Sequence, residues 1–379
     1  MTNNSVMLAA GGTGGHLFPA FALAEELARR GITVDLMTDQ RGDRYGTGFP
    51  ARAIHAVPSA TFAGRSPIAL LRTGWTLARG ILAARRVLAD VKPAAVVGFG
   101  GYPSFPPLIA ARSRRIPSVL HEQNAVLGRA NRFLTRHVAA IATSFETTKF
   151  LEAPDSAKAR VTGNPVRQIV IDQAGRPYAP SVTTAAFHLV VFGGSQGARY
   201  FSDVVPPALM LLPADLRARI QLVQQCRAED MERVQAAYAG AGITAILAPF
   251  FTDLPARMAG AHLVISRAGA SSVAELAVLG RPSILVPLPH ALDNDQLQNA
   301  TRLAESGAAW CFEQNSLTPQ RLVGEIERLM RAPDTLAAAA AAAILQGRPD
   351  AVKRLADLVE TVMGRSIPTR GDTVDADAR

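Results

Sequence analysis

The sequence predicts an α/β protein of two similar, doubly wound domains with parallel sheets. Its 379 residues suffice for two domains, each with its own core. Short apolar runs alternate with helical patterns in both halves, which is typical of βα units. Glycine-rich loops follow apolar runs at residues 11–16, 98–102 and 193–197. Because glycine permits tight turns and close approach of the backbone to a ligand, the outer two loops, each leading into a helix, predict phosphate sites.

The elements follow from the position of the apolar runs. Strands are expected at 6–10, 33–38, 94–98, 118–122 and 139–143, then at 187–192, 221–226, 243–248, 262–266, 283–287 and 309–312. A helix is expected over 19–30, ending at Gly31, and another over 68–89. Residues 160–186, rich in glycine and proline, predict a connection between the domains. Residues 336–345 and 351–363 are expected to be helical, and the polar tail 367–379 to be disordered.

Composition narrows the class of protein. The net charge of +9 indicates an anionic partner, which could be a nucleic acid, a membrane surface or a substrate. The two cysteines, Cys226 and Cys311, lie in apolar runs and are expected to be core thiols in a reducing compartment. Residues 1–10 lack the features of a signal peptide, and no apolar stretch is long enough to span a bilayer. A soluble, cytoplasmic protein is therefore expected.

The first glycine loop fits neither common nucleotide motif. No Gly-Lys-Ser/Thr follows it, and Leu17 stands where the third glycine of a dinucleotide fingerprint belongs. Asp39 could serve as the ribose-binding acid of a dehydrogenase, but the broken fingerprint argues against that class. His16 follows the glycines directly, so its imidazole could reach a bound group. Ser195 in the third loop offers a hydroxyl beside backbone donors, which suits a diphosphate.

Two further polar segments lie in the second half. Residues 266–275 end a strand and open a helix, where Ser271 and Ser272 could bind a phosphate and Glu275 a ribose; alternatively, Ser271 only caps the helix. Residues 287–299 carry amides and carboxylates that fit sugar hydroxyls or a plain solvated loop. The triplet 293–295 has a DxD pattern, yet no metal cluster of convincing spacing is present. Neither a metal nor a cofactor is expected.

Taken in order, these segments resemble the motifs of the MurG family, the N-acetylglucosaminyltransferases of peptidoglycan synthesis. The resemblance rests on residues 11–19, 98–102, 121–124, 163–167, 193–199 and 269–275, and on Gln296 with 299–300. It implies an α/β GT-B architecture, two facing Rossmann-like domains with a C-terminal helix that crosses back to the first. The expected domains are 1–163, joined by a helix at about 348–365, and 164–347, followed by the tail 366–379. Asp295 departs from the family, in which glutamine or histidine often precedes the sugar-binding glutamine.

The resemblance also implies a reaction. N-acetylglucosamine moves from UDP-N-acetylglucosamine to the C4 hydroxyl of undecaprenyl-diphospho-N-acetylmuramoyl-pentapeptide (lipid I), with inversion, giving lipid II and UDP. For the base, His16 is preferred and Glu122 comes second. The other implied substrate contacts are Thr13, Gly14, Gly15, Asn124, Arg167, Ser195, Phe251, Ala270, Ser271, Ser272, Glu275 and Gln296. The acceptor diphosphate is assigned to Gly100, Gly101 and Tyr102, together with the first loop.

The helix expected at 68–89 has two apolar faces. Leu70, Leu77, Ile81 and Leu88 are expected to pack on the sheet. A second stripe comprises Ile68, Leu71, Trp75 and Leu82, flanked by Arg72, Arg79 and Arg86. A tryptophan beside arginines suits an anionic bilayer surface, so the protein is expected to lie peripherally on the cytoplasmic face of the membrane. Alternatively, residues 51–65 cover this stripe.

Three other functions compete with this interpretation. The nearest is another GT-B enzyme, such as a glycolipid glycosyltransferase or a UDP-N-acetylglucosamine 2-epimerase. UDP release that occurs only with a lipid-diphosphate acceptor would distinguish the expected enzyme from these. A nicotinamide-dependent oxidoreductase would change NADH absorbance. A nucleic-acid-binding module would interleave aromatic side chains with its arginines, and few are present here, so no nucleic acid partner is expected.

Overall fold

The computed structural model describes residues 4–11, 14–39, 48–60, 66–181, 185–194 and 198–364. They form two compact units, and neither is one continuous stretch of chain. Unit 1 comprises the chain up to Gln123, Leu127–Pro165, and the chain from Asp350 on. Unit 2 comprises Asn124–Val126 and Val166–Pro349. The expected disordered tail, 366–379, lies outside the described residues.

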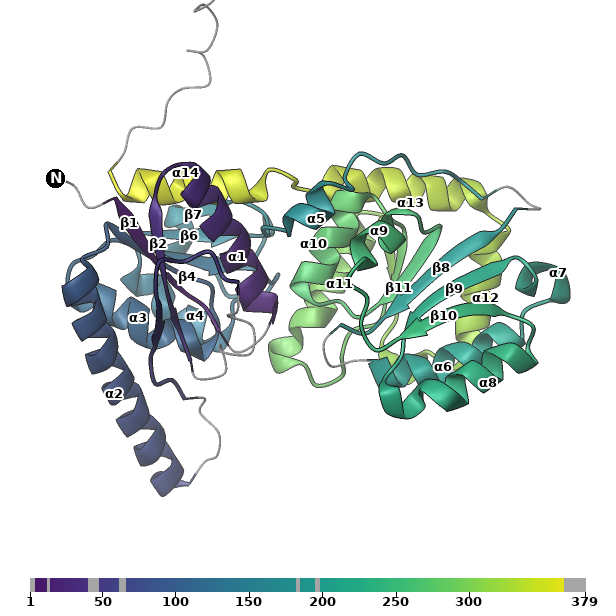
Figure 1. Ribbon diagram of the computed structural model, residues 1–379, viewed down its shortest axis with the longest axis horizontal. Helices are drawn as coiled ribbons and strands as arrows, with labels where there is room; N and C mark the ends of the chain where they lie inside the picture. The colour runs from purple at the N-terminus through teal and green to yellow at the C-terminus, as the bar shows by residue number, and fades with distance from the viewer. Residues whose placement is uncertain are drawn as a thin grey trace, which may run out of the picture. The chain divides into compact units, whose positions relative to one another are not determined.

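Unit 1 is built around a parallel sheet in which the strands lie in the order β3-β2-β1-β4-β5-β6-β7 (Figure 1). Apart from a seventh strand, this is the order of the dinucleotide-binding doubly wound fold. The strands are β1 (Ser5–Ala9), β2 (Thr33–Thr38), β3 (Ile54–Ala56), β4 (Ala95–Gly98), β5 (Ser118–Glu122), β6 (Ala140–Thr143) and β7 (Ala159–Val161).

Helices cover both faces of this sheet. They are α1 (Gly14–Arg29), α2 (Pro67–Val91), α3 (Gly101–Ser113), α4 (Arg129–Leu134) and α14 (Ala351–Val362). One core cluster joins β1 and β2 to α1 and α14, with Leu27 and Leu355 fully buried in it. The opposite cluster joins the sheet to α2 and α3. The final helix therefore completes the core of the unit with which the chain begins.

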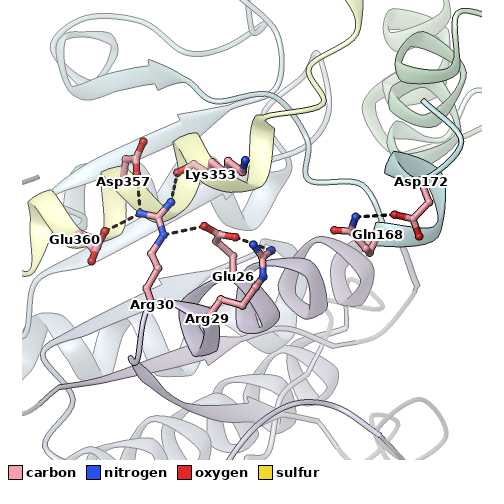
Figure 2. A network of polar contacts seen from close by, with 8 residues as sticks. All are labelled: Glu26, Arg29, Arg30, Gln168, Asp172, Lys353, Asp357 and Glu360. Carbon is pink, nitrogen blue, oxygen red and sulfur yellow. Dashed lines mark hydrogen bonds and ion pairs between the residues drawn. The ribbon is translucent and has the colours of Figure 1, made fainter. Parts of the chain in front are cut away.

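Arg30 fixes α14 to α1 through an ion-pair network (Figure 2). Its Nη1 donates to Asp357 and Glu360, at 2.6 Å each, and its Nε donates to Glu26 at 2.8 Å. Glu26 is only 6% exposed and also pairs with Arg29. One mostly buried guanidinium thus joins three carboxylates, two of them on α14.

We expect Arg30→Met to lower the free energy of unfolding by about 2 kcal/mol, because it removes the cation that three carboxylates share, one of them on the almost fully buried Glu26. Denaturant titration of the purified protein measures this. The matched control is Arg354→Met on the same helix, where an exposed pair with Asp350 is worth at most about 0.5 kcal/mol. Equal stability of the two variants would show that Arg30 does not hold α14.

Unit 2 has a parallel sheet in the order β10-β9-β8-β11-β12-β13, the doubly wound order without addition (Figure 1). Its strands are β8 (Phe187–Phe192), β9 (Ile220–Gln225), β10 (Thr244–Ala248), β11 (Leu263–Ser266), β12 (Ser283–Leu285) and β13 (Ala309–Cys311). Its helices are α5 (Gln168–Ile171), α6 (Ala198–Met210), α7 (Ala214–Arg217), α8 (Met231–Gly240), α9 (Leu254–Ala259), α10 (Ala270–Leu279), α11 (Asp295–Glu305), α12 (Pro319–Met330) and α13 (Pro333–Gln346).

The expected α/β fold class of two Rossmann-like domains is confirmed, while several element bounds differ. The helix α1 begins at Gly14 rather than at residue 19, so Pro19 lies inside it. The connection expected at 160–186 contains the end of β7 and the short α5. Strand β3 was not expected. Cys226 is buried as expected and Cys311 is half-buried, and both are free thiols.

Candidate functional site

In each unit, two loops flank the point where the strand order reverses, which is where doubly wound folds bind ligands. In unit 1 this point lies between β1 and β4. The loops that leave the carboxyl ends of these strands are the first two glycine loops. In unit 2 it lies between β8 and β11, and the corresponding loops are the third glycine loop and the segment before α10.

The backbone conformation of the second glycine loop requires glycine at positions 100 and 101. Their φ angles are +81° and +68°, in the left-handed region that favours glycine. A Cβ atom at Gly100 would lie 2.9 Å from the amide nitrogen of Asn131. At Gly101 it would lie 3.2 Å from Nε2 of His16. The backbone of the second loop therefore contacts the imidazole of His16, the candidate base, at Gly101. Tyr102 follows in the first turn of α3.

His16 lies in the first turn of α1, after Gly14 and Gly15, and its Nδ1 is 2.8 Å from the carbonyl oxygen of Phe99. Because a carbonyl can only accept, Nδ1 carries the proton and the lone pair of the neutral ring is at Nε2. Burial lowers the pKa of His16 below 6.5, although the bond to Phe99 opposes this shift. A neutral imidazole with a defined basic nitrogen is suited to proton abstraction.

Glu122, the second candidate base, ends β5 and is almost fully buried. Its Oε2 accepts hydrogen bonds from the backbone N–H of Gly128 at 2.9 Å and from the side chain of Asn131 at 2.7 Å. The carboxylate thus fixes the turn into α4. This engagement favours His16 as the base.

In unit 2, the third glycine loop is described up to Gly194, which has a φ of +71°. The backbone N–H of Gly193 donates to Oε1 of Gln225. Ser195 lies outside the described residues, as does Thr13 in unit 1.

The helix α10 begins with the features of an anion site. Its N-cap residue is Gly269, and no side chain caps it. Ser271 is the second residue of the helix, so the alternative that Ser271 only caps the helix is wrong. The Ser271 hydroxyl is buried and has no hydrogen-bond partner among the described residues. The N–H groups of Ala270, Ser271 and Ser272 occupy the first turn, where orphan donors attract phosphate.

Arg167 and Glu275 lie together, 108 positions apart in sequence. Nε of Arg167 donates to one carboxylate oxygen of Glu275 at 3.0 Å and Nη2 to the other at 3.1 Å. Burial raises the pKa of Glu275, whereas the charge and hydrogen bonds of Arg167 lower it. The structure therefore brings the expected diphosphate and ribose residues to one point beside α10.

Asn299 organises the sugar-binding candidates. It is fully buried on α11, and its Oδ1 accepts from the backbone N–H of Ala125 at 2.8 Å. Its Nδ2 donates to Oδ1 of Asn124 at 3.0 Å and to the carbonyl of Ala268 at 3.2 Å. These bonds attach the segment Asn124–Val126 to unit 2. The side chain of Asn124 is thereby aligned beside the start of α10.

The polar loop before α11 is held by Gln296, whose Oε1 accepts from the backbone N–H of Leu288 at 3.0 Å. Asp293 has a left-handed φ of +56°, and burial raises the pKa of the neighbouring Asp295. Over the described part of the chain, no three His, Cys, Asp or Glu side chains are grouped to hold a metal. Phe251 is half-buried, and the Arg257 guanidinium lies 4.9 Å from its ring centre.

The second stripe of α2 is exposed, so the described part of the loop, residues 51–60, does not cover it; residues 61–65 lie outside the described residues. Ile68, Leu71, Trp75 and Leu82 are 80%, 78%, 67% and 57% exposed. Arg72, Arg79 and Arg86 are exposed beside them. Leu77 and Leu88 are buried as expected, whereas Leu70 is 48% exposed, like the other described apolar side chains at the start of α2. None of the helices described is long and apolar enough to cross a membrane.

Comparison with known proteins identifies the class. The N-terminal domain of glycosyltransferase family 28 matches residues 6–143, and the C-terminal domain of that family matches residues 188–355. Together with the two Rossmann-like domains, these matches define a glycosyltransferase with the GT-B fold.

Full-length relatives identify the family. A UDP-N-acetylglucosamine--N-acetylmuramyl-(pentapeptide) pyrophosphoryl-undecaprenol N-acetylglucosamine transferase of Chelativorans sp. (strain BNC1) is 54% identical, covering 96% of each chain. The enzyme of that name from Methylobacterium sp. (strain 4-46) is 55% identical over 95% of this chain and 98% of its own. The crystal structure of Acinetobacter baumannii MurG has a TM-score of 0.78 at 30% identity, covering 94% and 99% of the two chains. The chain belongs to the MurG family.

A more distant solved structure shares only the fold. UDP-GlcNAc 2-epimerase from Neisseria meningitidis, solved bound to UDP-GlcNAc, has a TM-score of 0.66 at 17% identity. It covers 95% of this chain and 100% of its own.

Asn131 was not expected as a site residue, whereas Asn299 belongs to the polar segment 287–299 that was expected to bind sugar hydroxyls. Both lie inside helices, and their amides satisfy buried partners from distant segments. The sequence signal was an asparagine at an otherwise apolar helix position. Such a signal does not identify the partner.

Proposed function

We propose that this chain transfers N-acetylglucosamine from UDP-N-acetylglucosamine to the C4 hydroxyl of undecaprenyl-linked lipid I, giving lipid II and UDP in peptidoglycan synthesis. The observation that carries this proposal is the full-length likeness to relatives that bear the name of this reaction, at 54–55% identity. It is supported by the bidentate ion pair of Arg167 and Glu275, which joins two of the expected donor contacts in unit 2.

Unit 2 is proposed as the donor domain. The start of α10 offers N–H groups to the diphosphate, supported by Arg167 and Ser195. Glu275 binds the ribose, and Phe251 lies against uracil. Asn124 and Gln296 bind the sugar, with Asn299 aligning Asn124. Helix N-terminal donors and a guanidinium aimed at the diphosphate stabilise the charge that develops as UDP leaves.

Unit 1 is proposed as the acceptor domain. Gly14, Gly15, Gly100, Gly101 and Tyr102 present backbone groups to the lipid diphosphate. Nε2 of His16 takes the proton from the C4 hydroxyl as that oxygen attacks the anomeric carbon. A single displacement inverts the anomeric centre. The neutral state of His16 and its fixed tautomer support this role.

We also propose that the exposed stripe of α2 (Ile68, Leu71, Trp75 and Leu82 with Arg72, Arg79 and Arg86) binds the anionic cytoplasmic face of the membrane. An apolar row with a tryptophan can enter the headgroup region, and each arginine contributes about 1 kcal/mol there. A lipid-linked acceptor requires the enzyme to work at such a surface.

Trp75→Glu is expected to weaken binding to anionic vesicles at least tenfold, because it adds a negative charge and removes an exposed apolar anchor. Cosedimentation with phosphatidylglycerol vesicles measures the effect. Ile344→Glu is the matched control, since Ile344 is a 58% exposed apolar residue of unit 2. Unaltered vesicle binding by Trp75→Glu, or equal loss in the control, would contradict this surface.

A single assay tests the reaction. The protein is incubated with UDP-N-acetylglucosamine and a short-chain lipid I analogue, and the disaccharide product and UDP are measured. UDP release that needs the acceptor, with a β-1,4-linked product, supports the proposal. Epimerised sugar formed without the acceptor would instead identify a 2-epimerase.

A further inference from the structure

The side chain of Gln123 lies between two buried histidines of unit 1, and its role follows from their protonation. Gln123 directly follows β5 and is 4% exposed. One end of its amide is 2.6 Å from Nδ1 of His16. The neighbouring residue His121 is fully buried on β5, and the side chain of Gln123 contributes to the pKa of its imidazole.

Backbone carbonyls fix which nitrogen of each ring carries the proton. Nδ1 of His16 faces the carbonyl of Phe99 at 2.8 Å, and Nε2 of His121 faces the carbonyl of Gly163 at 3.4 Å. Because a carbonyl only accepts, His16 is protonated at Nδ1 and His121 at Nε2. Burial lowers the pKa of both rings, that of His121 to about 4, so both are neutral at neutral pH. The two histidines therefore hold opposite tautomers.

These tautomers determine the orientation of the amide. With Nε2 of Gln123 toward His16, two N–H groups face each other. Oε1 of Gln123 and Nδ1 of His121 are then both buried without a hydrogen-bond partner. The two ends of an amide have nearly the same shape, so the orientation must be inferred from the partners. Rotating the amide by 180° places Oε1 on the Nδ1–H of His16 and directs an N–H to the bare Nδ1 of His121.

We propose that Gln123 is a positioning residue that links Gly163, His121 and His16 in one hydrogen-bond relay and keeps the lone pair of His16 at Nε2, beside Gly101. The relay gives the Nδ1–H of His16 two acceptors, Phe99 and Gln123, and satisfies both orphaned atoms. As proton transfer makes His16 cationic, both oxygens stabilise the charge at Nδ1. The expected effect on turnover rests on the proposed role of His16 as the base. The tautomers of the two histidines are independent of that role, because they follow from the backbone carbonyls.

Long-range ¹H–¹⁵N NMR of the labelled full-length protein tests the relay. At neutral pH, His16 is expected as the Nδ1–H tautomer and His121 as the Nε2–H tautomer. In Gln123→Met, the Nε2–H form of His16 should rise to a tenth or more, and kcat should fall about tenfold or more, with a smaller change in the acceptor KM. Gln123→Glu keeps an oxygen on Nδ1–H and should restore the tautomer of His16.

Gln224→Met is the matched control, because Gln224 is a fully buried glutamine of unit 2 that accepts a hydrogen bond from Tyr238. It should leave the His16 resonances unchanged. Wild-type His16 protonated at Nε2, or Gln123→Met with wild-type resonances and turnover, would overturn the relay. Undiminished turnover in His16→Ala would refute the base role while leaving the tautomer result intact, so the two failures are distinguishable.

Discussion

Replacing His16 by alanine is expected to lower kcat by about 10²- to 10⁴-fold, the usual contribution of a general base. The reason is the position of His16 in the first turn of α1, with its basic Nε2 beside Gly101 and the opposite nitrogen held by Phe99. Turnover with a short-chain lipid I analogue measures the effect. The KM of the donor should change little, because the proposed donor contacts of unit 2 remain.

The pH dependence provides an independent check on His16. Its pKa lies below 6.5 because of burial, so the basic form persists at mildly acidic pH. Activity is therefore expected above the pKa of His16 in the folded protein. It should be lost only as the pH falls through that pKa and the imidazole becomes protonated. His188→Ala, which removes an exposed histidine of unit 2, serves as the control. If His16→Ala retained turnover, Glu122 would be the next candidate.

The second large effect is expected at Glu275. Glu275→Gln removes the charge that pairs with Arg167 and that we propose binds the ribose hydroxyls. Hydrogen bonds to a charged group contribute about 1.5–3 kcal/mol, so donor affinity should fall about 10- to 150-fold. Calorimetric titration with UDP measures this, and the donor KM should rise by a similar factor.

Three companion variants show whether this loss of donor affinity is specific. Glu305→Gln removes an exposed carboxylate of α11 that pairs with Arg302 and should leave UDP binding unchanged. Arg167→Met tests the partner, and the double variant measures their coupling. Wild-type UDP affinity in Glu275→Gln would exclude the ribose role.

The buried strands could be predicted because parallel strands covered on both faces consist of continuous apolar runs. The strands at 33–38, 118–122 and 187–192 have the expected bounds. The edge strands β3 and β7 have three residues each and are mostly exposed, so they carry no apolar run. The start of α1 was placed too late, at residue 19, because the glycines that open the helix are poor helix formers. In the structure, the helix already begins at Gly14.

The candidate site was predictable as a set of loops but not as a set of contacts. The glycines of the second loop indicated a site at Gly100 and Gly101. Their positive φ angles and close neighbours explain why glycine is needed at both positions. The pairing of Arg167 with Glu275 joins residues 108 positions apart, and the bond from Asn299 to Asn124 spans 175. Such pairings depend on tertiary packing, which spacing along the chain does not encode. The orientation of Gln123 likewise depends on two distant carbonyls.

The return of α14 to unit 1 affects how the protein is synthesised. Leu355, Ala356 and Val359 belong to the same core cluster as Leu17 and Leu23. The part of the protein that leaves the ribosome first can therefore complete its core only after residue 359 has emerged. Until then, the growing chain exposes the apolar surface that α14 will cover, a state prone to aggregation. A nascent chain stalled after residue 349 should consequently bind chaperones.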